Sequence, residues 1–213
     1  MRLAVTVGFE SRLVMRALAR LGPVDDYFLL RGITGKEGDR ESAETVSDLI
    51  RTLGKGQEIQ VDLIDLSRGL NRIVELEFDI MALAGGPRAL ILLAFVAAIL
   101  RKSDIYLVPE FSIEPVRISG FRVLKELGGL TEARLRAFVN VGIGSTAEDV
   151  AKRIGVDKTT AYRHLEWLAD RGLVRVEGGR MRRYSADPLS VAVASGYLRL
   201  MEKEVAKSAG DKV

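Results

Sequence analysis

The chain has 213 residues, of which 47% are hydrophobic and 29% charged, a composition typical of a globular protein. It contains no cysteine and one histidine, His164. This excludes disulfides, thiolate metal sites, cysteine nucleophiles and any metal site that needs several histidines. The most apolar segment, residues 89–100, is shorter than the ~20 residues that a membrane-spanning helix needs. We therefore expect a cytoplasmic protein with no membrane partner, no metal and no cofactor.

Charge is unevenly distributed along the chain, although the net charge is only +3. Residues 1–116 carry 14 basic and 17 acidic side chains, residues 117–185 carry 14 and 8, and residues 186–213 carry 4 of each. An excess of basic residues in the middle segment suggests that this segment meets a polyanion. A solvated basic surface would give the same counts.

Short strand-like runs alternate with helix-like stretches over the first 108 residues. Strands are predicted at residues 2–7, 26–30, 58–65, 80–84 and 105–108, and helices at 11–21, 40–53, 67–74 and 87–100. Alternation of this kind calls for a parallel sheet that helices cover on both faces. The predicted fold class is therefore α/β, with a Rossmann-like, mostly parallel sheet flanked by helices.

Two loops of this first part lie where an open α/β sheet binds ligands, at the carboxyl ends of strands. One loop, residues 6–11, follows the first strand, and the other follows the fourth. In the second loop, Gly85 and Gly86 let backbone N–H groups approach phosphate oxygens. Pro87 suits the first helical position and Arg88 could pair with an anion. A tight turn without a ligand would use the same residues, and neither loop carries a Walker A or GxGxxG motif.

Strands and helices stop alternating in the second part of the chain. A helix is predicted at residues 131–139. The next helix is capped either by Ser145, whose spacing to Glu148 fits a capping box, or by Thr146, and it ends at Gly155.

A third helix begins after its cap, Asp157, and ends at Gly172. The residues expected to face the core from this helix are Ala161, Leu165 and Leu168. Two strands follow, at residues 173–176 and 181–184, and a turn with two glycines joins them. This order predicts an α+β winged helix-turn-helix domain.

In such a domain the third helix enters the major groove of DNA and the hairpin lies along the backbone. The residues expected to contact DNA are Lys158, Thr159, Thr160, Tyr162 and Arg163 on the helix, and Arg180, Arg182 and Arg183 on the wing. Arg163 is expected to contact a base, because its guanidinium matches the acceptors of guanine, and the wing arginines to follow phosphates. His164 and Trp167 are expected to pack rather than to catalyse or to stack on bases. A winged helix that binds only protein remains an alternative.

The two halves together resemble the archaeal CRISPR-associated transcriptional regulators, in which a CRISPR-associated Rossmann-fold (CARF) domain precedes a winged helix-turn-helix. In that family the loop after the first strand reads roughly Thr-Leu-Gly-Phe-Asp/Glu, and here it reads Thr6-Val7-Gly8-Phe9-Glu10. The loop after the fourth strand commonly reads Asn-x-Thr-Gly-Gly-Thr-Arg/Lys. Here the two glycines and the basic residue remain, whereas Ala82, Ala84 and Pro87 replace the polar residues.

The resemblance covers nearly the whole chain and implies its organisation. It implies a CARF-like sensing domain over residues 1–116, a linker over 117–130, a winged helix over 131–185, and a C-terminal helix and tail over 186–213. A homodimer would form a two-fold pocket for a cyclic oligoadenylate, most often cyclic tetra-adenylate. The residues implied in ligand binding are Gly8, Phe9, Glu10, Ser11, Gly85, Gly86, Pro87 and Arg88. The dimer would bind a palindromic double-stranded operator and regulate CRISPR-associated genes without catalysis.

Three other functions fit the same sequence. A CARF pocket can cleave its own ligand, and Thr6, Ser11 and Arg88 offer polar groups for such a ring nuclease. A repressor unrelated to CRISPR could sense another nucleotide or a phosphorylated metabolite. A nucleotide-dependent enzyme could use its winged helix only for protein contacts.

Overall fold

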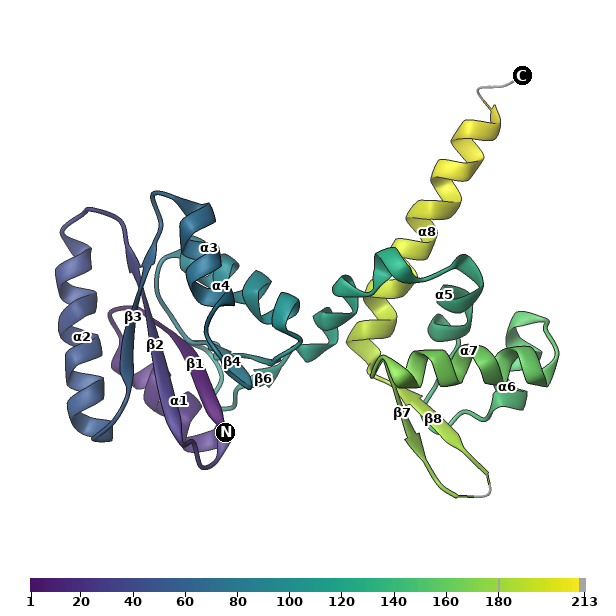
Figure 1. Ribbon diagram of the computed structural model, residues 1–213, viewed down its shortest axis with the longest axis horizontal. Coiled ribbons are helices and arrows are strands. Elements are labelled where there is room, and N and C mark those ends of the chain that lie inside the picture. The colour runs from purple at the N-terminus through teal and green to yellow at the C-terminus, as the bar shows by residue number, and fades with distance from the viewer. Residues whose placement is uncertain (180, 211–213) are drawn as a thin grey trace. The chain divides into compact units, whose positions relative to one another are not determined.

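The computed structural model describes residues 1–179 and 181–210, with side chains up to residue 203. Two compact units divide the chain, Met1–Ser119 and a second unit that begins at Gly120. Their ribbons are drawn from purple to teal and from teal to yellow in Figure 1. Each unit has its own hydrophobic core and is described by itself.

The first unit contains a six-stranded sheet in the order β3-β2-β1-β4-β5-β6, in which only β6 runs antiparallel to its neighbour. Its strands are β1 (Arg2–Val7), β2 (Asp26–Ile33), β3 (Gln57–Asp62), β4 (Ile80–Leu83), β5 (Asp104–Leu107) and β6 (Val116–Arg117). Its helices are α1 (Ser11–Leu21), α2 (Gly38–Leu53), α3 (Leu66–Val74) and α4 (Arg88–Arg101). The α/β fold class predicted for this part is confirmed.

Continuous burial of the central strands explains their sequence. Every residue of β4 is buried, and so are the last five residues of β1. Helices α1 and α2 cover one face of the sheet, and α3 and α4 cover the other (Figure 1). A strand that is buried on both faces must be apolar along its whole length, which is why these runs do not alternate.

Among the predicted boundaries that differ from the structure, β2 continues to Ile33 beyond residue 30, and two others differ for identifiable local reasons. β3 ends at Asp62 and not at residue 65, because the Asp62 carboxylate accepts hydrogen bonds from the N–H groups of Ile64 and Asp65 and turns the chain. Pro87 is the N-cap of α4 and not its first helical residue, since its ψ of 142° is extended. The short strand β6 was not predicted.

The second unit has the order of a winged helix. Its elements are α5 (Glu132–Val139), α6 (Ala147–Ile154), α7 (Lys158–Asp170), the hairpin β7 (Val174–Glu177) and β8 (Arg183–Ala186), and α8 (Pro188–Gly210). Leu135, Phe138, Leu165 and Tyr184 are fully buried in one core that these elements share. The winged helix-turn-helix predicted from the sequence is confirmed.

Capping residues fix where the two helices of the helix-turn-helix begin and end. The Asp157 carboxylate accepts from the N–H of Thr160 at the start of α7, and Gly155, with φ of 71°, ends α6, as predicted. The capping box, however, joins Thr146 to Asp149 and not Ser145 to Glu148. Ser145 instead pairs with β8 in a backbone bridge and so cannot take the cap.

Residues 117–130, which were expected to form a linker, belong to the folded units. Arg117 pairs in β6 with Tyr106. The following 3-10 helices, η1 (Ser119–Lys125) and η2 (Leu127–Gly129), contribute Val123 and Leu127 to the core of the second unit. Apolar side chains in this span therefore hold it against the winged helix.

Leu165→Ala tests whether α7 is held by this core. Loss of a fully buried leucine side chain leaves a cavity and is expected to lower the free energy of unfolding by about 2–5 kcal/mol. Urea unfolding followed by the fluorescence of Trp167, the one tryptophan of the chain, measures it. Ile143→Ala, at a side chain that is 89% exposed in the same unit, should change stability by less than about 0.5 kcal/mol. Equal effects of the two substitutions would contradict the core assignment.

Candidate functional site

The loops after β1 and β4 meet at the carboxyl edge of the sheet through two glycines. A Cβ added at Gly8 would lie 2.5 Å from the backbone nitrogen of Gly86, so no other residue fits there without moving the backbone. Gly86 itself has φ of 104°, in the region that favours glycine. The buried hydroxyl of Thr6 accepts hydrogen bonds from the N–H groups of Ala84 and Gly85, at 3.0 and 3.2 Å. These contacts fix the second loop against the first.

A cavity of about 250 Å³ opens beside this contact. The residues that line it are Gly8, Phe9, Gly32, Thr34, Gly38, Asp39, Ser42, Gly86 and Pro87. Four of the eight predicted ligand residues line it, whereas Glu10, Ser11, Gly85 and Arg88 do not. Glu10 forms an ion pair with Arg12, at 2.5 Å between Oε2 and Nε. Arg88 and Ser11 are exposed at the first positions of their helices.

The loop after β2 supplies the part of the cavity that was not predicted. The stretch from the end of β2 to the start of α2 supplies these residues, with Gly32 in β2, Thr34 in the loop, and Gly38 and Asp39 in the first turn of α2. Its three glycines in seven residues, directly after a strand, were a usable signal in the sequence. The ring of Phe9 lies so close to Gly38 that an added Cβ there would be 3.1 Å from Cζ.

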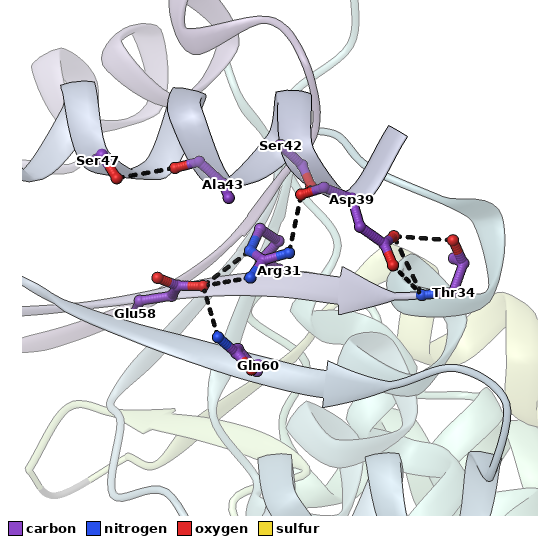
Figure 2. A network of polar contacts seen from close by, with 8 residues as sticks. All are labelled: Arg31, Thr34, Asp39, Ser42, Ala43, Ser47, Glu58 and Gln60. Atoms are coloured by element: carbon purple, nitrogen blue, oxygen red, sulfur yellow. Dashed lines mark hydrogen bonds and ion pairs between the residues drawn. The ribbon is translucent and has the colours of Figure 1, made fainter. Parts of the chain in front are cut away.

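A partly buried ion pair between Arg31 and Glu58 supports this loop from the strands beneath it (Figure 2). Arg31 on β2 is 6% exposed, and its guanidinium bonds Oε1 of Glu58 on β3 through Nε at 2.8 Å and Nη2 at 2.7 Å. Its Nη1 donates to the backbone oxygen of Asp39 at 3.0 Å. The start of α2 is therefore tied to the two strands beneath it.

The carboxylate of Asp39 closes the same loop from above. It accepts from the N–H and the hydroxyl of Thr34 at 2.8–3.1 Å (Figure 2). It also accepts from the N–H of Gly35 at 2.8 Å. Burial alone would raise the pKa of Asp39, but the hydrogen bonds together hold it below the ordinary value of 3.8. A carboxylate with these donors is charged and fixed at neutral pH.

Asp39→Asn should weaken the loop in a pH-dependent way. A lowered pKa in the folded state means that the ionised group stabilises the fold above its ordinary pKa, and that this stabilisation is lost as the pH falls through the folded pKa. The variant is expected to melt below the wild type at pH 7, and the difference should shrink as the pH falls below 3.8. Thermal unfolding across this range measures it, with Asp48→Asn on the exposed side of α2 as the control. A difference that stays constant with pH would contradict the assignment.

On the second unit, the predicted residues of α7 form an exposed surface. Lys158, Thr159, Tyr162 and Arg163 are exposed. Thr160 is half-buried, because its hydroxyl donates to the Asp157 carboxylate at 2.6 Å and completes the helix cap. Four of the five predicted helix residues are thus available to a ligand on the outer surface of α7.

The wing arginines differ from one another. Arg180 lies outside the described residues. Arg182 forms an ion pair with Glu166 of α7, and Arg183 donates to the backbone oxygen of Gly144 at 3.2 Å. Glu166 was not among the predicted DNA-contacting residues, although it follows Lys158 and Tyr162 at the four-residue spacing of one helix face.

His164 and Trp167 lie on the inner flank of α7. Burial, followed by the charge of Arg134, lowers the pKa of His164 below 6.5, so the imidazole is neutral at pH 7. The indole of Trp167 is half-buried between the guanidinium groups of Arg134 and Arg171, at 4.2 and 3.6 Å from the ring centre. Stacking of bases on this ring would require both arginines to leave.

Among residues 1–179 and 181–210, no group of three or more acidic or histidine side chains is placed to hold a metal ion. No helix in this described part of the chain has both the length and the apolar character to cross a bilayer.

A Rossmann-like unit with a glycine-built edge pocket, followed by a winged helix, defines the class of CARF-containing DNA-binding regulators. Residues 1–119 match the family described as the Csa3 CRISPR-associated Rossmann-like domain, and residues 126–190 match the sugar-specific transcriptional regulator TrmB. A "CRISPR locus-related putative DNA-binding protein Csa3" from Thermoproteus tenax is 43% identical over 202 residues, or 95% of this chain and 97% of that protein. The chain belongs to the Csa3 family of CRISPR-associated DNA-binding regulators.

Solved structures resemble the chain more distantly. A MarR-family transcriptional regulator from Silicibacter pomeroyi is 25% identical with a TM-score of 0.31, covering 40% of this chain and 65% of that one. The transcriptional regulator MosR of M. tuberculosis is 31% identical with a TM-score of 0.32, covering 42% and 70%. Can2 from Sulfobacillus thermosulfidooxidans, solved with cyclic tetra-adenylate, is 11% identical with a TM-score of 0.43, covering 96% and 66%.

Proposed function

We propose that this protein regulates CRISPR-associated genes by changing its affinity for operator DNA when a cyclic oligoadenylate, cyclic tetra-adenylate in the first instance, binds the pocket at the carboxyl edge of its sheet. The observation that carries this proposal is the pocket beside the close contact of Gly8 with Gly86. The same chain carries a winged helix. We propose that the protein acts in the cytoplasm and has no catalytic residue of its own.

The pocket suits half of a cyclic oligonucleotide. Its walls at Gly8, Gly32 and Gly86 expose backbone, and Phe9 and Pro87 offer flat apolar surface to a base. Arg88, exposed in the first turn of α4, has the charge and the position to meet a phosphate next to the pocket. Glu10, Ser11 and Gly85 adjoin the pocket in sequence and stay in the proposed ligand set.

A homodimer would supply the other half of the ligand site. Helix α4 exposes Leu92, Val96 and Leu100, at 64%, 40% and 43%, and their four-residue spacing puts them on one face. A contiguous apolar face of this kind is typical of a protein–protein contact. A two-fold dimer would present the same groups to each half of a symmetric ring and would read a palindromic operator.

The exposed surface of α7 is proposed to enter the major groove of that operator. The groove-facing set consists of Lys158, Thr159, Tyr162 and Arg163, with Thr160 contributing through the cap. Arg183 and Arg180 are proposed to follow phosphates from the wing. Arg163 is the proposed base contact, since its five N–H donors match guanine O6 and N7.

Arg163→Ala tests the base contact. The variant is expected to lose about 1–3 kcal/mol of discrimination at one base position and to retain its affinity for random duplex. Gel-shift titrations against the promoter of the neighbouring genes and against single-base variants of it measure the change. A uniform loss over all sequences would reassign Arg163 to a phosphate.

Gly8→Ala tests the effector pocket. Its Cβ would force the two loops apart, so affinity for cyclic tetra-adenylate should fall at least about 10-fold while basal DNA binding persists. Calorimetric titration measures the affinity. Gly128→Ala is the matched control, since no atom lies within 4 Å of the position of its Cβ.

The coupling of the two sites is tested with the same titration. Linkage requires that DNA change the affinity for the ligand by the factor by which the ligand changes the affinity for DNA. Equal ligand affinities with and without operator would leave a DNA-binding protein without the switch.

Linear products after incubation with cyclic tetra-adenylate would identify a ring nuclease instead. Larger thermal shifts with other nucleotides would favour a metabolite sensor, and failure to bind DNA at low salt would favour the enzyme alternative.

A further inference from the structure

Glu166 on α7 uses both carboxylate oxygens to hold the wing. Oε2 accepts from the guanidinium of Arg182, and Oε1 accepts from the hydroxyl of Tyr184 at 2.8 Å. Tyr184 on β8 is fully buried, and the side chains of Glu166 and Arg182 are 30% and 47% exposed. The Glu166 carboxylate therefore joins α7 both to a core residue and to the edge of the hairpin.

A groove of about 310 Å³ lies between the wing, the start of α6 and the face of α7 that carries Lys158 and Tyr162. Lys158 and Tyr162 line it from the helix, and Gly179, Met181 and Arg182 line it from the wing. Glu166 is not among the residues that line the groove, but its bond to Arg182 joins α7 to the wing beside it. Its position thus sets how far the wing stands from the helix.

The outer part of the wing makes few apolar contacts that could hold it in place. The hairpin pairs over only four residues of each strand, and an isolated two-stranded hairpin is marginally stable in water. Near its tip, Met181 is 65% exposed and Val176 is 39% exposed. The Arg182–Glu166 pair is therefore the specific contact that fixes the outer part of the wing to α7.

The pair also changes what Arg182 can do electrostatically. The hydrogen bond from Arg182 is the largest of the effects that hold the pKa of Glu166 below its ordinary value, so the carboxylate is charged throughout the neutral range. An arginine that is already paired with a carboxylate contributes little to the release of counterions from DNA. The positive charge of Arg182 is instead neutralised by Glu166 within the protein.

We infer that Glu166 is a positioning residue for DNA recognition, which fixes the wing against the reading helix and withholds the charge of Arg182 from the phosphates. The inference rests on the proposed function, because it assumes that α7 and the wing bind duplex DNA. It reassigns Arg182, which the sequence placed on a phosphate, to the setting of the groove. Arg183 and Arg180 keep the proposed phosphate role.

The test compares salt dependence with specificity in the full-length protein. The dissociation constant is measured for a duplex from the promoter of the neighbouring genes and for a random duplex of equal length, over a range of salt concentrations. The variants are Glu166→Gln, Arg182→Gln and the double variant. Glu177→Gln is the matched control. It removes one carboxylate from the same hairpin, at a position whose cross-strand partner is Arg183 and not Arg182.

Glu166→Gln should free Arg182, steepen the slope of log affinity against log salt by about 0.9, and lower the ratio of specific to random affinity about 10-fold. Arg182→Gln should lower that ratio similarly with an unchanged slope, and the double variant should combine the wild-type slope with the low ratio. Glu177→Gln should keep the wild-type ratio. A merely structural role would not move the slope in this pattern.

Other results would overturn the inference. If Arg182→Gln made the slope shallower by about 0.9 and Glu166→Gln changed neither quantity, Arg182 would contact a phosphate directly. If Glu166→Gln fails to fold, Tyr184→Phe removes one bond and keeps the ion pair, and it should leave the slope at the wild-type value; a steeper slope would refute the charge-withholding role. Absence of wild-type DNA binding at low salt would remove the proposed function itself, which no variant result can mimic.

Discussion

The first unit depends on one close approach, in which the backbone of Gly8 meets the backbone of Gly86. The contact leaves no room for a Cβ, and the buried Thr6 hydroxyl fixes the second loop by accepting two of its N–H groups. Parallel strands β1 and β4 are neighbours in the sheet, so their carboxyl ends bring these loops together. A pocket with bare backbone on its walls follows from that geometry. The Arg31 and Asp39 contacts then hold its third wall.

The DNA-binding half depends on helix caps and on a single core. Thr146 and Asp149 start α6, Asp157 starts α7, and each satisfies backbone N–H groups that would otherwise lack partners. The buried face of α7 packs Leu165 into the same core as Tyr184 of the wing. Helix α7 and the hairpin are therefore parts of one packed body, and the outer surface of α7 is left exposed.

Ion pairs within the protein partly offset the excess of basic side chains in residues 117–185. Lys158 lies 3.8 Å from Glu148, and Arg182 pairs with Glu166, so two of the cations on the predicted DNA surface have acidic partners in the protein. Exposed pairs of this kind exchange partners at little cost. The Arg182 pair is different, because its carboxylate is also held by a buried tyrosine. The two pairs therefore differ in how firmly they hold their cations.

Apart from the short strand β6 and the two 3-10 helices, the sequence by itself determined the order of elements, both fold classes, the caps at Asp157 and Gly155, and the two glycine loops, because these follow from local periodicity and backbone preference. It did not determine the wall formed by Thr34 and Asp39, nor the partner of Arg182. Thr34 and Asp39 are close in sequence, but they reach the pocket only when β2 lies beside β1, and Arg182 meets Glu166 only when the wing folds back on α7. Side-chain pairs across elements have no period in the sequence, and the same holds for the cap at Thr146, where strand pairing of Ser145 decided between two equally suitable residues. Only the tertiary structure brings such groups together.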